Sequence, residues 1–304
     1  MSKITVKELM KNAVENKYSV GYFESWSQDS AQAVVRAAEN MNSPVMIGVC
    51  GTYIGEPSRE SKESVTLYKA VLSQLAEEAK VPVAILLNES DDEQMVVDAA
   101  KAGFDMVMYA PVFSDNIPSL DELTVIQKRI VEQAHQYGAA VEGEVGELPL
   151  FNTETGQVYE GEDTEPDVLK KFVEETGVDT VAVSVGNCHL KEDGYASINF
   201  DALKVLAETV DIPLVLHGGT SISKEDLSKA AGMGVGKVNF GTGMKRLALN
   251  VMKEYLANND VDKMDPNDVL GRGTNRDLIV LQRKAVMQYV EETIEAMNGK
   301  NKAF

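Results

Sequence analysis

The sequence lacks the features that mark secreted, membrane-spanning and nucleic-acid-binding proteins. Its two cysteines, Cys50 and Cys188, are too few and too far apart for a disulfide framework, and this usage is typical of a reducing cytoplasm. No stretch approaches the ~18 apolar residues of a membrane helix, and the amino-terminal segment lacks the apolar core of a signal peptide. With a formal charge of −19, the chain has no excess of basic residues for nucleic acid or an anionic membrane. We therefore expect a cytoplasmic protein that binds neither.

What the sequence does contain is a regular alternation of short apolar runs and helix-period segments. Continuous apolar strands separated by helices indicate a parallel sheet covered on both faces. Eight such units predict a closed (β/α)8 TIM barrel, as a single domain over residues 1–304. An open doubly wound sheet is the alternative, but no GxGxxG motif follows the first run. The runs occupy residues 19–24, 44–50, 83–89, 105–111, 139–146, 179–186, 213–218 and 236–242.

Three further segments lie outside this alternation. An N-terminal helix is predicted by the amphipathic pattern and by Thr5 and Glu8, which have the spacing of a capping box. Extra helices are expected after the eighth strand. Residues 147–163, between the fifth strand and its helix, are acidic and contain glycine. Loops of this length in compact domains are often functional, so we predict a mobile loop there, with a solvated surface loop as the alternative.

Polar residues occur where the apolar runs end, which is the side of a TIM barrel that carries the active site. The first run ends in Glu24 and the third in Asn88 and Glu89. The fifth run carries Glu142 and Glu144, which are two residues apart and therefore point to one face.

Two of the three histidines also lie at strand ends: His189 follows the sixth run and His217 ends the seventh. Two imidazoles and a carboxylate suit a divalent metal, so Glu89, His189 and His217 are predicted to bind one. The alternative is that each histidine is an ordinary core or surface residue. The third, His135, lies near the end of a helix and is assigned no chemistry.

Glycine-rich turns follow the seventh and eighth runs. Glycine lets backbone amides approach an anion, and TIM barrels frequently bind phosphate with these two loops. We therefore predict a phosphate site, with ordinary tight turns as the alternative. Its residues are Gly218, Gly219, Thr220, Ser221, Asn239, Gly241 and Thr242.

Over most of its length the chain resembles the class II, metal-dependent fructose-bisphosphate aldolase family. The resemblance rests on the order and spacing of SPVMIGVCG, VPVAILLNES, AAVEGEVGEL, GVDTVAVSVGNCH, VLHGGTSIS and KVNFGTGMK. It implies a divalent metal, zinc in the first place with manganese or iron as alternatives, and a small phosphorylated sugar as the partner. The metal would stabilise the ene-diolate of dihydroxyacetone phosphate when a carbon–carbon bond breaks. The resemblance also implies a homodimer or homotetramer.

Residue by residue, the resemblance assigns His189 and His217 to the metal and the two glycine-rich turns to the phosphate and triose. Glu144 matches the glutamate of the family's VExELG segment and is placed with the metal ligands. The family's HLDH, however, stands here as LLNE at residues 86–89. An amide, Asn88, therefore replaces the acid that handles a proton, and Glu89 replaces a histidine ligand.

Asn88 can hydrogen-bond a ligand hydroxyl but cannot shuttle a proton. Another acid, Glu24, Glu142 or Glu154, is then expected to act in catalysis. Glu24 is favoured because it stands where the family has Asn, and the alternative is that Glu24 faces solvent. We expect an aldolase-like lyase that acts on a phosphorylated ketose other than fructose bisphosphate. A catalytically inactive phospho-sugar-binding homologue and a metal-assisted epimerase are the alternatives.

Overall fold

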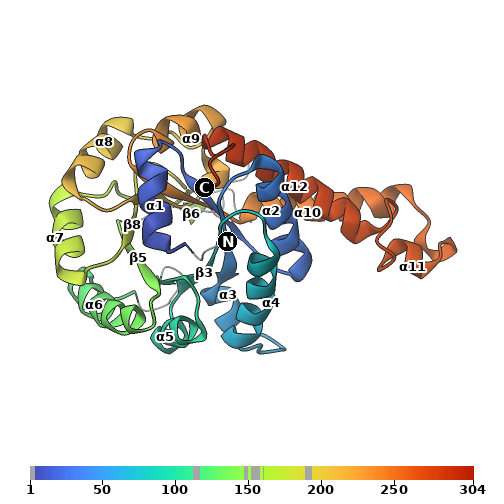
Figure 1. The fold of residues 1–304 in the computed structure, drawn as a ribbon, viewed down its shortest axis with the longest axis horizontal. Helices are drawn as coiled ribbons and strands as arrows, with labels where there is room; N and C mark the ends of the chain where they lie inside the picture. Colours follow the sequence, from blue (N-terminus) through green and yellow to red (C-terminus); the bar gives the residue numbers. More distant parts are fainter. Residues whose placement is uncertain (1–3, 112–116, 147–149, 152–157, 160, 189–193) are drawn as a thin grey trace.

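A closed barrel of parallel strands forms the centre of the computed structural model, which describes residues 4–111, 117–146, 150–151, 158–159, 161–188 and 194–304 (Figure 1). The strands are hydrogen-bonded in the order β1-β10-β9-β8-β5-β4-β3-β2. This arrangement confirms the predicted TIM barrel. The barrel strands are β1 (Val20–Glu24), β2 (Val45–Cys50), β3 (Val83–Ser90), β4 (Met106–Tyr109), β5 (Ala140–Val145), β8 (Thr180–Val183), β9 (Leu214–Leu216) and β10 (Val235–Phe240).

Amphipathic helices surround the barrel, and several begin or end where the sequence carries a cap. Ser27 and Ser119 close capping boxes at α2 and α6, and Gly103 and Gly177 end α5 and α7 in the left-handed conformation. The surrounding helices are α2 (Gln28–Met41), α3 (Gly51–Gly55), α4 (Val65–Glu78), α5 (Glu93–Ala102), α6 (Leu120–Gln136), α7 (Pro166–Thr176), α8 (Phe200–Thr209), α9 (Lys224–Ala231) and α10 (Thr242–Asn258).

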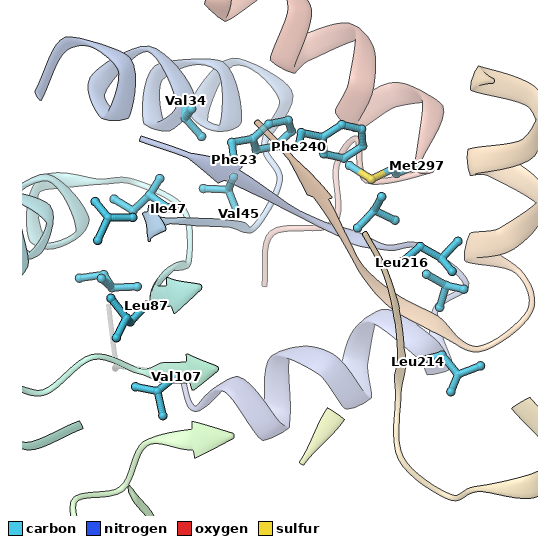
Figure 2. Packing of buried hydrophobic residues seen from close by; sticks show 14 of the residues in the cluster. Phe23, Val34, Val45, Ile47, Leu87, Val107, Leu214, Leu216, Phe240 and Met297 are labelled. Atoms are coloured by element: carbon cyan, nitrogen blue, oxygen red, sulfur yellow. The ribbon is translucent and has the colours of Figure 1, made fainter. Parts of the chain in front are cut away.

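The expected extra helices follow α10. They are α11 (Pro266–Val269) and α12 (Leu278–Ala296), which packs against α2 and α10. The apolar layer between barrel and helices is continuous here. Phe23 of β1 stacks on Phe240 of β10 with ring centroids 5.2 Å apart, and Met297 lies beside them (Figure 2). The first and last barrel strands, β1 and β10, therefore pack against Met297, which directly follows α12.

The predicted N-terminal helix is α1 (Val6–Glu15), and Thr5 and Glu8 form its capping box. It lies across one end of the barrel (Figure 1). Its buried Leu9 and Met10 share a cluster with Met46 and Leu86, which point into the barrel from β2 and β3. The amino-terminal end of the barrel is therefore filled with apolar side chains, and the polar interior residues lie toward the opposite end.

Most of the predicted mobile loop, residues 147–163, lies outside the described residues. Within it, β6 (Leu150–Phe151) pairs antiparallel with β7 (Val158–Tyr159). Over the described residues, no helix combines the length and apolar character needed to cross a bilayer.

Candidate active site

A histidine held between two carboxylates occupies the carboxyl end of the barrel interior. The Nε2 atom of His217, directly after β9, lies 2.9 Å from Oε1 of Glu142, and its Nδ1 lies 2.9 Å from Oε1 of Glu89. His217 and Glu142 are fully buried. A neutral imidazole donates through one nitrogen only, so two carboxylate partners require the imidazolium form. Burial by itself lowers the pKa of His217, but its bonds to Glu142 and Glu89 raise this pKa to about 10.

A buried lysine forms an ion pair with the second carboxylate oxygen of Glu142. Nζ of Lys237, on β10, lies 2.9 Å from Oε2 of Glu142 and donates to Oδ1 of Asn239 at 2.5 Å. Burial raises the pKa of Glu142, but the charges and hydrogen bonds of Lys237 and His217 outweigh it and bring the pKa below the ordinary value. Burial lowers the pKa of Lys237. Both carboxylate oxygens of Glu142 contact these two partners, and this geometry indicates that Glu142 positions the ring of His217.

The donor atoms around Nδ1 of His217 are those that divalent metals take. Oε1 of Glu144 lies 4.0 Å from this nitrogen, is buried and has no hydrogen-bond partner among the described residues. Burial raises the pKa of Glu144 to about 7. The imidazole of His217 and the carboxylates of Glu89 and Glu144 are donors of the chemical types that the implied metal binds.

The described residues do not already form a complete metal-binding group of three or more such side chains. Nδ1 of His217, which lies 2.9 Å from the carboxylate of Glu89, would have to lose its proton before it could bind a metal. The remaining predicted ligand, His189, lies outside the described residues, as does Glu154. Their roles stay predictions.

Glu89 reaches His217 because the backbone of β3 is irregular at this point. The pairing of β3 with β4 shifts register between Leu87 and Ser90, and Glu89 has a positive φ of 43°. A residue other than glycine pays about 1–2 kcal/mol for this conformation. The hydroxyl of Thr52 donates a 2.7 Å hydrogen bond to the backbone carbonyl of Glu89. Such strain commonly occurs at functional sites, and here it accompanies the contact of Glu89 with His217.

Asn88, at the place of the missing acid, is buried and faces the same interior. Its Oδ1 accepts a 3.2 Å hydrogen bond from Nδ2 of Asn239, which comes from β10 across the barrel. Asn239 in turn accepts from Lys237. The two amides and the lysine therefore form one chain of hydrogen bonds that ends at Glu142.

Glu24 does not face solvent, because only 14% of its side chain is exposed and it lines the same cavity as Asn88 and Glu89. Its Oε1 accepts a short hydrogen bond from Nζ of Lys245, in the first turns of α10. Burial raises the pKa of Glu24, and the charge of Lys245 opposes this shift. Glu24 is thus a largely buried carboxylate with a raised pKa at the rim of the cavity.

The two glycine-rich turns meet beside these residues around a small cavity of about 60 Å³. Gly218 requires glycine, because its φ is +65° and a Cβ would lie 2.2 Å from the Cys188 carbonyl. Ser221 is buried, accepts from the Cys188 amide and donates to the Gly218 carbonyl, so it holds the turn in place. Gly219 is also buried. The other predicted anion-binding residues, Gly218, Thr220, Asn239, Gly241 and Thr242, line the cavity together with Cys188.

Sequence reasoning did not identify Lys237 or Lys245. A signal for Lys237 was present, since it lies two residues before Asn239 and so on the same face of a strand that is otherwise apolar. Lys245 belongs to a helix, where an exposed lysine is ordinary. Its contact with Glu24 could therefore be seen only in the folded chain.

Known proteins match this chain over nearly its full length. The model of the family described as fructose-bisphosphate aldolase class-II matches residues 4–302. The fructose-bisphosphate aldolase of Staphylococcus epidermidis is 30% identical over 307 residues, covering 100% of both chains. The probable fructose-bisphosphate aldolase of Bacillus subtilis is 31% identical over 277 residues, 89% of this chain and 92% of that protein.

Solved structures agree with these matches. The crystal structure of the YdjI aldolase from Escherichia coli K12 superposes with a TM-score of 0.76 at 25% identity and covers 98% of each chain. A putative fructose-1,6-biphosphate aldolase from Coccidioides immitis has a TM-score of 0.80 at 22% identity, covering 98% of this chain and 97% of that one, and this likeness supports the fold alone.

The barrel and these full-length matches are those of an aldolase-like carbon–carbon lyase. The chain belongs to the class II fructose-bisphosphate aldolase family, which confirms the resemblance seen in the sequence.

The pair formed by Lys237 and Glu142 yields the first prediction. Replacing Lys237 with Met leaves the buried carboxylate of Glu142 without its cation, so we expect the free energy of unfolding to fall by about 3–5 kcal/mol. The double variant Lys237→Met, Glu142→Gln removes that charge and should recover part of the loss. Urea denaturation measures both.

The matched control is Lys224→Met. It breaks an ion pair of 2.8 Å with Glu292 whose side chains are 60% and 48% exposed, so it should cost less than about 1 kcal/mol. If the free energy of unfolding of the double variant fell by the sum of the losses in Lys237→Met and Glu142→Gln, Lys237 and Glu142 would not be coupled.

Proposed function

We propose that this protein is a metal-dependent aldolase that cleaves or forms a phosphorylated ketose other than fructose 1,6-bisphosphate. One observation carries the proposal. Donor atoms of Glu89, Glu144 and His217 converge beside a cavity lined by both glycine-rich turns, while an amide, Asn88, stands at the position of the family's acid. The binding parts of the site are present, and the proton-handling part has changed.

The ligand set favours zinc, with manganese or iron as alternatives. A bound divalent metal would supply Lewis-acid polarisation of the ketose oxygens. The protein's own residues bind and orient the substrate. Glu89, Glu144, His217 and, by resemblance, His189 hold the metal, and Glu142 with Lys237 fixes the ring of His217.

The phosphate is proposed to lie between the turns at residues 218–221 and 239–242. α10 begins at Thr242, directly after Gly241, so its N-terminal dipole favours an anion there. The amide of Gly243 donates to Oγ1 of Thr220 at 3.3 Å, which joins the start of α10 to the other glycine-rich turn. The net charge of −19 repels an anion at long range. Within a few ångströms, however, the local dipoles dominate because solvent and salt screen the distant charges.

Turnover tests the function directly. We expect the metal-replete protein to release triose phosphate from one member of a panel of phosphorylated ketoses, with kcat/KM at least about tenfold above that for fructose 1,6-bisphosphate. Chelation should abolish this activity, and added zinc, manganese or iron should restore it. The variant His217→Ala should lose stoichiometric metal, as measured by elemental analysis.

Two other results would identify the alternatives. Binding of dihydroxyacetone phosphate without cleavage of any ketose would indicate an inactive phospho-sugar-binding homologue. Interconversion of ketose phosphates without triose release would indicate an epimerase.

Glu24 is the proposed replacement for the missing acid, because it is largely buried, lines the cavity and has a raised pKa. We expect Glu24→Gln, which can still accept the hydrogen bond from Lys245, to lower kcat on the best ketose by about 10²–10⁴-fold. Asn88→Asp should change kcat little or lower it, since a second acid is not needed. Unchanged turnover in Glu24→Gln would exclude this residue and leave Glu142 or Glu154.

We also propose that the protein is a homodimer or homotetramer whose contact includes an arm that leaves the barrel. The arm consists of α10, α11 and the start of α12 and projects to one side (Figure 1). Leu249, Met252 and Leu256 of α10, spaced three and four apart on one face, are 53%, 39% and 55% exposed, and Leu270 beyond α11 is 55% exposed. An apolar stripe of this kind on a projecting element favours a second copy as its cover.

Light scattering of the purified protein should therefore give a mass of at least two chains. Leu256→Glu should shift the mass toward one chain, because a carboxylate would be buried in the contact. Val205→Glu, at a 48% exposed position on α8 on the other side of the barrel, is the control and should change nothing. A wild-type monomer would refute the proposal.

A further inference from the structure

Tyr22 is a buried tyrosine on the inner face of β1. It lies two residues before Glu24, so both side chains point into the barrel. Its neighbours in the strand register are Asn239 of β10 and Met46 of β2. The residue is 1% exposed, and its ring belongs to the apolar cluster that fills the barrel above α1.

The hydroxyl of Tyr22 lies at the boundary between this apolar layer and the polar one. Tyr22 lines the same cavity as Asn88, Glu89, Thr220 and Asn239. Its hydroxyl has no hydrogen-bond partner among the described residues. A buried hydroxyl without a partner is destabilising, and phenylalanine would fill the same space without that penalty. The hydroxyl therefore suits a ligand in the cavity better than it suits the unliganded fold.

The surroundings keep this hydroxyl neutral. Burial raises the pKa of Tyr22 well above its ordinary value, and the charges of Glu24 on the same strand, Cys50 on β2, Glu89 on β3 and Glu142 on β5 act in the same direction. Nζ of Lys237 lies 5.3 Å from the centre of the ring. A neutral phenol donates one hydrogen bond, and a donor aimed at an oxygen that becomes negative stabilises that charge without losing its proton.

We propose that Oη of Tyr22 donates a hydrogen bond to an oxygen of the bound triose phosphate, beside Asn88 and Asn239. The inference rests on the proposed aldolase function and adds a catalytic residue to it. The donor acts by hydrogen bonding alone, so no bond to the tyrosine forms or breaks. It stabilises negative charge that develops on the sugar oxygen when the carbon–carbon bond is cleaved.

The test compares Tyr22→Phe with Tyr18→Phe in the full-length protein. Tyr18 is 0% exposed, belongs to the same apolar cluster and donates to Oδ1 of Asn12 at 2.9 Å. The two residues are thus matched in exposed fraction, and the hydroxyl of Tyr18 differs from that of Tyr22 in having a partner. We expect Tyr18→Phe to lower the Tm by about 1–3 °C and to leave binding and turnover unchanged. Tyr22→Phe should leave the Tm unchanged or raise it.

For ligand binding and turnover we expect Tyr22→Phe to have the larger effect, whereas for the Tm Tyr18→Phe should have the larger effect. Calorimetry should give an affinity for dihydroxyacetone phosphate about tenfold weaker in Tyr22→Phe. On the best ketose of the panel, kcat should fall by about 10²-fold, more than KM rises. Affinity and turnover within twofold of wild type, or a Tm loss as large as that of Tyr18→Phe, would overturn the proposal. Failure of the proposed aldolase function would be distinguishable from failure of the Tyr22 proposal, because the wild-type protein itself would then release no triose phosphate.

Discussion

The bonds that hold His217 between Glu142 and Glu89 are the interaction on which the rest of the site depends. The ring is fully buried, and both of its nitrogens lie 2.9 Å from carboxylate oxygens. Charged groups are costly to bury unless each has a partner in good geometry. The partners come from β3, β5, β9 and β10, which are distant in sequence, so the cluster forms only when the barrel closes. The charges of Glu142, Glu89, Lys237 and His217 then sum to zero.

The apolar filling below this cluster makes the arrangement rigid. α1 and the inward residues of β1 to β4 pack one end of the barrel, and interiors of this density resist displacement of single side chains. The polar layer is therefore built on a closely packed apolar base. The strained backbone at Glu89 is tolerated because β3 is held by paired strands on either side.

At residue 88 an amide stands where the resemblance places an acid, so this position cannot transfer a proton. Asn88 preserves the hydrogen-bond chain through Asn239 to Lys237, since an amide can accept and donate. A carboxylate there would add a further negative charge to a layer that already holds Glu24, Glu89 and Glu144. The amide at residue 88 therefore limits the negative charge of a rim that already holds the carboxylate of Glu24.

The sequence by itself determined the barrel and the strand ends that line the site, because strand period, apolar runs and turn residues are local properties. The family followed from the resemblance of whole segments in order and spacing. It also supplied the inventory of polar residues at the carboxyl ends of the strands. The residue pattern did not distinguish Glu142 from Glu144, which are two residues apart on one face, and only the family resemblance placed Glu144 with the metal ligands. Only the tertiary structure decided that Glu142 faces Lys237 and His217 and is held ionised, while Glu144 lies one layer higher with a pKa of about 7. The reason is physical: the pKa and role of a buried group depend on partners from other strands, and barrel closure alone brings these partners within hydrogen-bond distance.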